Sequence, residues 1–340
     1  MRKEQVLSDI IKHEKPLHRT KIGGQALIEG IMMRGVGKAA MAVRKKDGEI
    51  AVEEWEIKAG KWYQKVPFVR GIFNFLLQMI DGYKYISKSA EISGMMDEDG
   101  EEEQTKFEKW LDDKFGEKIM NVVMGIAMVL GVALAVLLFV FCPTWIFSGI
   151  QALLGETDIS AFRSLFEGIL KIVIFIGYLW LTSLMKDIRR TYEYHGAEHK
   201  TIACYEAGEE LTVENIKKHR RFHPRCGTNF VFLVLAISIL IYSIVPINSE
   251  MFIAAFGVSQ FIADFIRVVC KLVLLPVVVG VSYEVIRLAG KYDNPVTRVI
   301  CAPGMALQRL TTREPDPSQI ECAIAAMKPV IPENKEIDKW

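Results

Sequence analysis

The sequence lacks an excess of charge of one sign, a cleavable signal peptide and a set of paired cysteines. Its 42 basic and 41 acidic residues leave a formal net charge of +1, so no excess of positive charge points to nucleic acid. We expect no nucleic-acid partner. The first 20 residues are polar and lack the apolar core of a cleavable signal peptide. The six cysteines form no paired framework, so we expect free thiols; they are Cys142, Cys204, Cys226, Cys270, Cys301 and Cys322.

A nucleotide-binding loop and an internal repeat are also missing. Residues 30–38, at the end of a glycine-rich stretch, invite comparison with a phosphate loop. A Walker pattern ending at Gly37-Lys38 would need glycine in place of Met32 and serine or threonine in place of Ala39. We therefore exclude nucleotide binding by that route, and interpret the glycines as tight turns or points of close backbone approach.

Long stretches with few or no charges dominate the middle of the chain. Residues 119–141 run for 23 residues without a charge, enough for a helix to cross a hydrocarbon core of roughly 30 Å. The sequence predicts a mainly α, polytopic membrane protein with about four transmembrane helices, at residues 119–141, 165–185, 229–247 and 268–288. Residues 251–266 are apolar but short, and predict an interfacial or re-entrant helix that leaves a fifth crossing open.

Charged residues in and between the spans suggest an orientation. In the second span, Glu167 and Lys171 lie near the outer end, where long side chains can reach the interface. The loop 186–227 holds nine lysines and arginines, whereas the segments 142–164 and 248–267 together hold only Arg163 and Arg267. Because cytoplasmic loops collect basic residues, we expect this loop and both termini on the cytoplasmic side of a bacterial plasma membrane.

The remaining sequence divides into regions around this bundle, 119–288. Residues 1–66 predict a small cytoplasmic unit that contains β-structure, with a hairpin of 39–46 and 49–57 joined by a two-residue Asp47-Gly48 turn. Residues 67–118 predict an amphipathic interfacial helix from Phe68 to about Ser93 and an acidic linker. Residues 289–340 predict a cytoplasmic tail, irregular over 294–312, with a short helix ending near Met327.

A histidine motif supplies the candidate chemistry. His195-Gly-Ala-Glu198-His199 has two imidazoles one helical turn apart, with an acid beside them. The same spacing binds zinc in His-x-x-Glu-His metallopeptidases, where the acid polarises a water molecule. If the second span continues as a helix through Tyr205, one stripe contains Ile188, Tyr192, His195, His199, Ile202 and Glu206. Both histidines then face inward together.

The further metal ligands follow from the expected topology. His223 and Cys226 immediately precede the third span, and Glu284 lies near the cytoplasmic end of the fourth. We expect them at the depth where the second span ends, so that a divalent transition metal, with zinc the expected ion, has candidate ligands His195, His199, His223, Cys226 and Glu284. Two observations argue against metal binding by these residues. Gly196 costs a helix about 1 kcal/mol relative to alanine, and Glu284 can pair with a basic residue instead of a metal.

Four blocks of sequence resemble the YqhQ-like family of bacterial membrane proteins. They are Gly-Gly-Gln-Ala-Leu-Ile-Glu-Gly-Ile-Met-Met-Arg-Gly (23–35), Tyr-His-Gly-Ala-Glu-His-Lys (194–200), His-Pro-Arg-Cys-Gly-Thr-Asn (223–229) and Leu-Gln-Arg-Leu-Thr-Thr-Arg-Glu-Pro (307–315). The resemblance covers about residues 20–328. It implies a membrane location and a metal-dependent enzyme, without an assigned reaction or substrate.

Two functions from different classes compete. The first is a metal-dependent hydrolase at the cytoplasmic membrane face, with Glu198 as the general base. The second is a non-catalytic scaffold or assembly factor whose metal site fastens the histidine-rich loop 186–228 to the bundle. A transporter is a weaker third possibility, because the spans contain few charges and no inverted repeat is evident.

Overall fold

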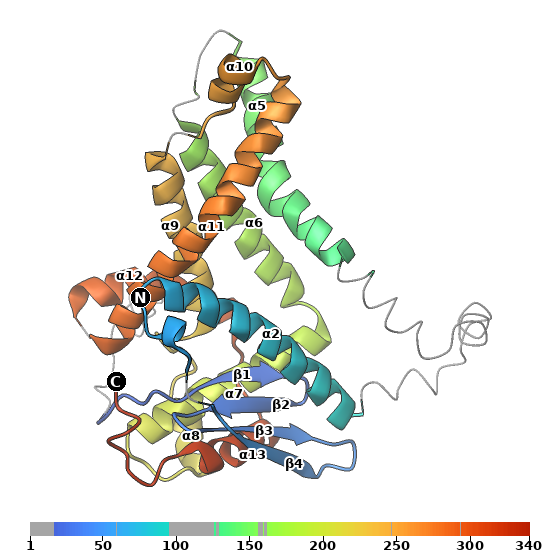
Figure 1. Cartoon of the computed structure of the whole chain (residues 1–340). Helices are drawn as coiled ribbons and strands as arrows, with labels where there is room; N and C mark the ends of the chain where they lie inside the picture. Colours follow the sequence, from blue (N-terminus) through green and yellow to red (C-terminus); the bar gives the residue numbers. More distant parts are fainter. Residues whose placement is uncertain are drawn as a thin grey trace, which may run out of the picture. The chain divides into compact units, whose positions relative to one another are not determined.

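A computed structural model describes residues 17–58, 60–94, 126, 129–155, 159, 162–245, 247–292 and 294–340 (Figure 1). The chain forms two compact units. Unit 1 combines Met1–Met95, Tyr178–Val234 and Pro276–Trp340, and unit 2 combines Met96–Gly177 and Leu235–Leu275. The acidic linker predicted before the first span lies outside the described residues.

Unit 1 contains a small antiparallel sheet with strands in the order of the chain. The strands are β1 (Gly23–Leu27), β2 (Gly30–Arg34), β3 (Lys38–Arg44) and β4 (Ile50–Glu56). Side chains alternate between its two faces: Ile31 and Met33 belong to one apolar core, and Met32 to another. The β-structure predicted in this region is therefore present, and it begins earlier in the chain than the predicted hairpin.

The β3–β4 hairpin closes through a longer loop than the two-residue turn that the sequence predicts. The Lys45 amide donates to the carbonyl oxygen of Glu49 at 2.9 Å, and the Gly48 amide donates to that of Lys45 at 3.0 Å. Gly48 has φ +88°. The loop is thus residues 46–48, with the glycine in the left-handed position that such three-residue loops favour.

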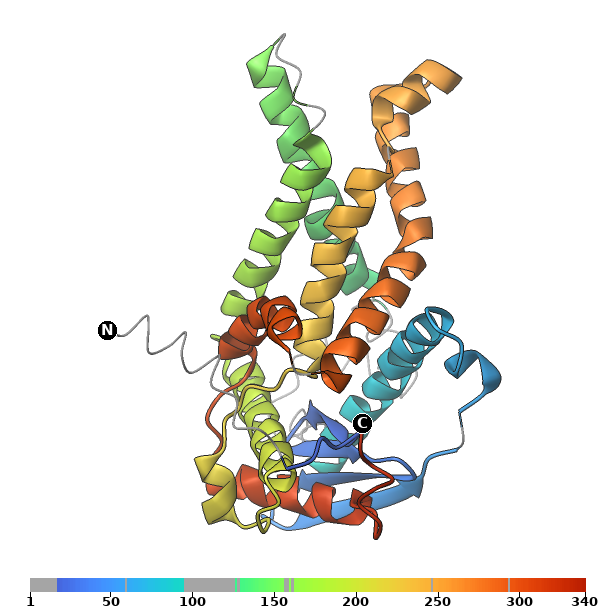
Figure 2. The ribbon, with the colours of Figure 1, turned by 90° about the vertical axis from the view of Figure 1, so that its left-hand side faces the viewer.

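Helices cover both faces of this sheet. Helix α2 (Val69–Ile92) contributes Tyr85 and Ile92 to one face, close to the predicted bounds of the amphipathic helix. Helices α7 (Lys186–Glu206) and α13 (Pro317–Met327) cover the other face. Figure 2 shows α13 and α2 on opposite sides of the sheet. Unit 1 is therefore a helix–sheet–helix sandwich, assembled from segments far apart in the sequence.

The histidine motif lies on a helix separate from the second candidate span. Helix α6 (Arg163–Thr182) ends before a turn, and Met185, with φ −72° and ψ 134°, is extended. Helix α7 then starts at Lys186 with Asp187 in its first turn, where a negative charge is favourable. The sequence left open whether the second span continues as one helix through Tyr205; it does not, because extended backbone at Met185 breaks the hydrogen-bond ladder.

The C-terminal region is folded into unit 1. Helix α12 (Pro295–Thr311) starts with an Asn294 capping box and a proline in its first turn, so the prediction of irregular structure over 294–312 is wrong. The short helix predicted to end near Met327 is present as α13. Its Cys322, Ala323 and Met327 are buried in the core, so this segment is not a tail.

Among the described residues, four helices are long and apolar enough to cross a membrane, and insertion is inferred from their length and composition. They are Val129–Leu154, Arg163–Thr182, Gly227–Ile244 (α9) and Gln260–Lys291 (α11). The first includes the π-helix η3 (Leu137–Phe141) and α5 (Cys142–Leu154), and it continues past the predicted end at Phe141, because the backbone of Phe141 and Cys142 is helical. Its predicted residues 119–125 and 127–128 lie outside the described residues.

The prediction of one helix over 251–266 is wrong. Helix α10 (Ser249–Phe256) ends at Gly257, whose φ of +62° and ψ of 23° are left-handed. The residues from Gln260 onward belong to α11. A glycine in the left-handed conformation is the usual helix terminator, and here it separates a short helix from a long one.

Unit 2 contains a buried cluster of charges. Glu167, expected to reach the interface, is only 2% exposed. Its carboxylate accepts a hydrogen bond from Arg163 Nε at 3.1 Å and from Lys271 Nζ at 3.0 Å, and further bonds from Arg267. Buried charges persist only when they are paired, and this carboxylate ties α6 to α11.

Candidate metal centre

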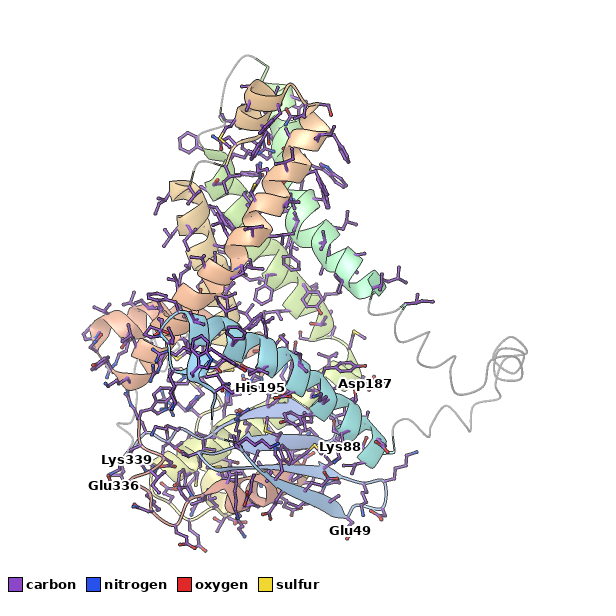
Figure 3. The ribbon with its side chains drawn as sticks, viewed as in Figure 1. Glu49, Lys88, Asp187, His195, Glu336 and Lys339 are labelled. Carbon is purple, nitrogen blue, oxygen red and sulfur yellow. The ribbon has the colours of Figure 1, made fainter. Side chains whose placement is uncertain are left out.

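Helix α7 places the three motif residues next to one another. His195 and His199 are one turn apart, with ring centroids 4.4 Å from each other. His195 is half-buried, whereas His199 is 1% exposed. In Figure 3 the labels of Asp187 and His195 mark the start and the middle of this helix. The helical spacing therefore gives two imidazoles a common neighbourhood, as the sequence predicts.

The glycine between the two histidines has a packing reason. A Cβ atom at position 196 would lie 1.9 Å from the carbonyl oxygen of Arg313. The chain after α12 crosses α7 at this point, where the Arg313 amide donates to the Tyr192 carbonyl at 2.8 Å. The two backbones can approach this closely only if residue 196 is glycine. This explains why a residue with low helix propensity lies inside α7.

Backbone carbonyls fix the orientation and tautomer of both imidazoles. His195 Nδ1 lies 2.8 Å from the Thr311 oxygen, and His199 Nδ1 lies 2.6 Å from the Arg221 oxygen. A carbonyl only accepts hydrogen bonds, so each Nδ1 carries the hydrogen, and a neutral ring then has its lone pair on Nε2. This is how metal-binding histidines are commonly held.

Cys226 completes the group of ligand atoms. Its Sγ lies 3.2 Å from His195 Nε2, and the Thr228 amide lies 3.4 Å from the same sulfur. One ligand atom from each of His195, His199 and Cys226 lies within 4.8 Å of the other two. Cys226 is 8% exposed. This group of His, His and Cys could hold a metal ion, and its donor atoms suit a zinc-like ion.

Glu198 points toward strand β1. A Cβ atom at Gly24 would lie 2.9 Å from the Glu198 carboxyl carbon, so the glycine leaves room for this side chain. Glu198 is 5% exposed, and burial raises the pKa of its carboxyl to about 7. The charge of His195 and a hydrogen bond from the Gly24 backbone lower this pKa, but burial has the larger effect. Glu198 is thus a buried carboxyl close to His195, outside the group of three ligand atoms.

His223 lies beside the three ligand residues but has other partners. Its ring centroid is 5.5 Å from that of His199. Its Nε2 lies 3.1 Å from the Arg225 guanidinium and 4.0 Å from a Glu206 oxygen. Its backbone amide donates a hydrogen bond to Gln308 Oε1 at 2.8 Å. His223 therefore packs against the candidate centre without joining the three ligand atoms.

Glu284 lies elsewhere in unit 1. Its carboxylate accepts hydrogen bonds from Arg70 Nε at 2.8 Å and from the Phe68 amide at 3.1 Å, where α2 packs against α11. A Cβ atom at Gly71 would lie 2.5 Å from the Tyr283 side chain, so close packing of the helices is built into α2. The structure thus pairs Glu284 with a basic residue and does not bring it to the histidines.

A second group has metal-ligand chemistry. Cys204, Glu209 and His219 each offer one ligand atom within 4.8 Å of the others. None of these three residues is among the ligands predicted from the sequence, where Cys226 is the one cysteine candidate. His219 Nε2 already lies 3.2 Å from Glu209, and burial raises the pKa of the Cys204 thiol to about 11.

The groups that support the motif could not be predicted from the sequence. Thr311 and Arg221 act through their carbonyl oxygens, and Gly24 through the space that it leaves. Backbone acceptors have no residue-type signature, so spacing rules cannot find them. The one available signal is the resemblance block 307–315, which contains Thr311 and Arg313.

Comparison with known proteins gives a family but no activity. The chain is 31% identical over 330 residues to a protein of Bacillus subtilis (strain 168) called uncharacterized protein YqhQ, covering 94% of each chain. No solved structure matches. Neither comparison supports a metal-dependent enzyme. Residues 66–333 match the family described as protein of unknown function (DUF1385), and the chain belongs to that family.

Proposed function

We propose that this protein is a membrane-anchored, metal-dependent hydrolase that binds a divalent transition metal, with zinc as the expected ion, through His195, His199 and Cys226. The observation that carries the proposal is the convergence of these three ligand atoms within 4.8 Å. Both imidazoles are oriented by backbone carbonyls, at 2.8 and 2.6 Å. A site that is oriented in this way needs little rearrangement to bind an ion.

Three protein ligands favour catalysis over a purely structural role. Structural zinc sites have four protein ligands, whereas catalytic sites leave one position for water or substrate. In the described part of unit 1, the nearest further candidate, His223, is engaged by Arg225 at 3.1 Å. A bound ion would act as a Lewis acid and lower the pKa of a water molecule.

Glu198 is the candidate general base. It lies one turn from His195 on the same helix, and it is buried beside Gly24. Its carboxyl is outside the ligand group, so it is free to accept a proton. An enzyme requires Glu198 as a base, whereas a metal-binding scaffold does not.

A structural metal site is the second candidate, and burial favours it. His199 is 1% exposed and Cys226 is 8% exposed. The ligands come from α7 and from the turn before α9, so an ion would fasten the segment 219–226 to the helix. A structural ion would stabilise unit 1 and would not require Glu198.

Elemental analysis of the purified full chain in detergent tests metal binding. We expect about one zinc-like ion per chain, and loss of that ion in His199→Ala. Glu284→Gln is the matched control, because Glu284 binds Arg70 and its replacement leaves the metal content unchanged. Wild-type protein without a transition metal contradicts both the enzyme and the structural site.

Cobalt substitution distinguishes the two candidates without a known substrate. A cobalt-loaded chain should show a thiolate charge-transfer band that Cys226→Ser removes. Added azide should shift the visible spectrum if one metal position is open, as the hydrolase requires. A spectrum that azide leaves unchanged, together with full in vivo function of Glu198→Gln, would favour the structural site.

A further inference from the structure

A group of basic side chains lies next to the candidate metal centre. We define the basic cluster as Lys200 of α7, Arg221 of the segment before α9, and Arg309 and Arg313 at the end of α12. A single carboxylate, Glu314, contacts two of them, Lys200 Nζ at 2.6 Å and Arg221 at 3.4 Å. Arg309 and Arg313 lie close enough for their charges to act on Arg221. Four basic groups with one acid leave an excess of positive charge.

The positive charge of the cluster is not compensated within the described part of the chain. The Nε atoms of Arg221 and Arg313 are buried and have no hydrogen-bond partner among the described residues. The pKa of Arg221 is lowered by burial and by the neighbouring charges of Arg313 and Arg309, against the effect of Glu314. Crowded guanidinium groups without enough acceptors are costly, and an additional anion would relieve the cost.

The same residues hold the metal-binding helix through their backbones. The Arg221 oxygen accepts from His199 Nδ1 at 2.6 Å, and the Arg313 oxygen packs on Gly196. Thr311, which accepts from His195, lies between Arg309 and Arg313 in sequence. The side chains of Arg221 and Arg313 therefore begin from backbone positions that contact the helix of the candidate metal centre.

We propose that the basic cluster binds a phosphate group, and that this phosphate belongs to the substrate of the metal centre. The substrate assignment rests on the proposed function, whereas phosphate binding does not. Planar guanidinium groups bind phosphate oxygens in pairs, and one ammonium with three guanidinium groups matches a dianion with several acceptor oxygens. A single carboxylate such as Glu314 needs fewer hydrogen-bond donors than a phosphate dianion does.

Glu314 acts as an internal competitor for this phosphate. Its side chain is 64% exposed, so it can leave Lys200 and Arg221 when a stronger anion arrives. The two kinds of substitution therefore have opposite effects. Removal of the arginines weakens phosphate binding, and removal of the Glu314 charge strengthens it.

Titration of inorganic phosphate into the full chain in a neutral detergent tests the binding. We expect saturable binding that falls about tenfold or more in the Arg309→Gln/Arg313→Gln variant and rises about threefold in Glu314→Gln. Arg189→Gln is the control, because Arg189 is an exposed arginine near the start of α7 and outside the basic cluster. Equal affinity in wild type and the double arginine variant, or equal competition by acetate at constant ionic strength, overturns the phosphate site.

A second arm identifies the source of the phosphate. Phosphatidic acid in mixed micelles that displaces inorganic phosphate from the wild type, but does not bind the double arginine variant, identifies a lipid headgroup. Inorganic phosphate that phosphatidic acid does not displace identifies a soluble phosphate ester. Both outcomes support the same recognition chemistry.

A third arm links the phosphate to the metal centre and separates the two proposals. Saturating phosphate should change the visible spectrum of the cobalt-loaded wild type but not that of the double arginine variant. A spectrum that saturating phosphate leaves unchanged overturns the substrate assignment. If the wild type binds no transition metal but still shows arginine-dependent phosphate binding, the proposed function fails and the phosphate site stands.

Discussion

At the scale of single residues, glycines determine how closely other groups approach the histidine motif. Gly196 admits the Arg313 carbonyl to α7, and Gly24 admits the Glu198 side chain to β1. These contacts join segments that are more than one hundred residues apart in the sequence. The geometry of the site therefore depends on these two glycines as well as on the ligand residues.

Gly196→Ala should destabilise the protein, although alanine is the better helix former. The new Cβ atom would lie 1.9 Å from the Arg313 oxygen, and a backbone atom cannot yield cheaply. We expect a loss of about 1–3 kcal/mol, as in other overpacked sites, measured as a lower free energy of unfolding in detergent.

Gly177→Ala is the matched control for this substitution. Gly177 also lies inside a helix, and a Cβ atom there would meet nothing within 4 Å. Alanine at this position should leave stability unchanged or raise it by up to about 1 kcal/mol. Equal effects of the two substitutions would show that the contact with Arg313 does not constrain position 196.

At the scale of elements, helix capping explains where the C-terminal helices begin. The Asn294 side chain accepts from the Thr297 amide at 2.9 Å, and the Asp316 side chain accepts from the Gln319 amide at 3.0 Å. Each cap is followed by proline in the first turn. Asn-Pro and Asp-Pro are thus helix-start signals, and the first of them lies in the segment predicted to be irregular.

Asp316 should make the stability of α13 depend on pH. Burial raises the pKa of its carboxyl, but hydrogen bonds from Ser318 and from the Gln319 and Ser318 amides outweigh burial and lower the pKa below its ordinary value. A carboxyl with a lowered folded-state pKa stabilises the protein above the unfolded-state pKa of about 4, and this contribution is lost as the pH falls through the folded-state value.

Thermal unfolding of Asp316→Ala and wild type between pH 3 and pH 7 measures this effect. We expect the variant to be less stable by about 1 kcal/mol at pH 7, with the difference shrinking below about pH 4. Asp316→Asn is the control, because it keeps the capping acceptor without the charge. A difference that is the same at both ends of the range would contradict a role for the ionised carboxylate.

At the scale of the whole molecule, the basic residues predict one orientation. Nine lysines and arginines lie in 186–227, against Arg163 and Arg267 in the segments predicted to face the other side. We expect Glu214 and Glu250, both exposed, on opposite sides of the membrane, with Glu214 cytoplasmic.

Cysteine labelling in intact cells tests this orientation. A membrane-impermeant maleimide should modify Glu250→Cys in intact cells, and Glu214→Cys only after the membrane is permeabilised. Mass spectrometry of the digested protein reads each site separately from the native cysteines. Labelling of both positions, or of Glu214→Cys alone, in intact cells would contradict the predicted topology.

The sequence by itself determined the features that depend on local pattern. Four long apolar helices, the amphipathic α2 and the β3–β4 hairpin follow from hydrophobic length and periodicity and from turn residues, which act within a few residues of chain. The pairing of His195 with His199 follows from one helical turn. The helix boundary at Gly257 was missed because apolar composition continues across it, and the sequence left open whether the second span continues as a helix beyond Met185.

Only the tertiary structure decided which distant residues join the histidines. Spacing left His223, Cys226 and Glu284 as equal candidates, and the fold brings Cys226 to His195, leaves His223 against Arg225, and pairs Glu284 with Arg70. Carbonyl partners, glycine contacts and the basic cluster were likewise decided by packing. The physical reason is that these contacts join segments tens to hundreds of residues apart, whose meeting no local pattern specifies.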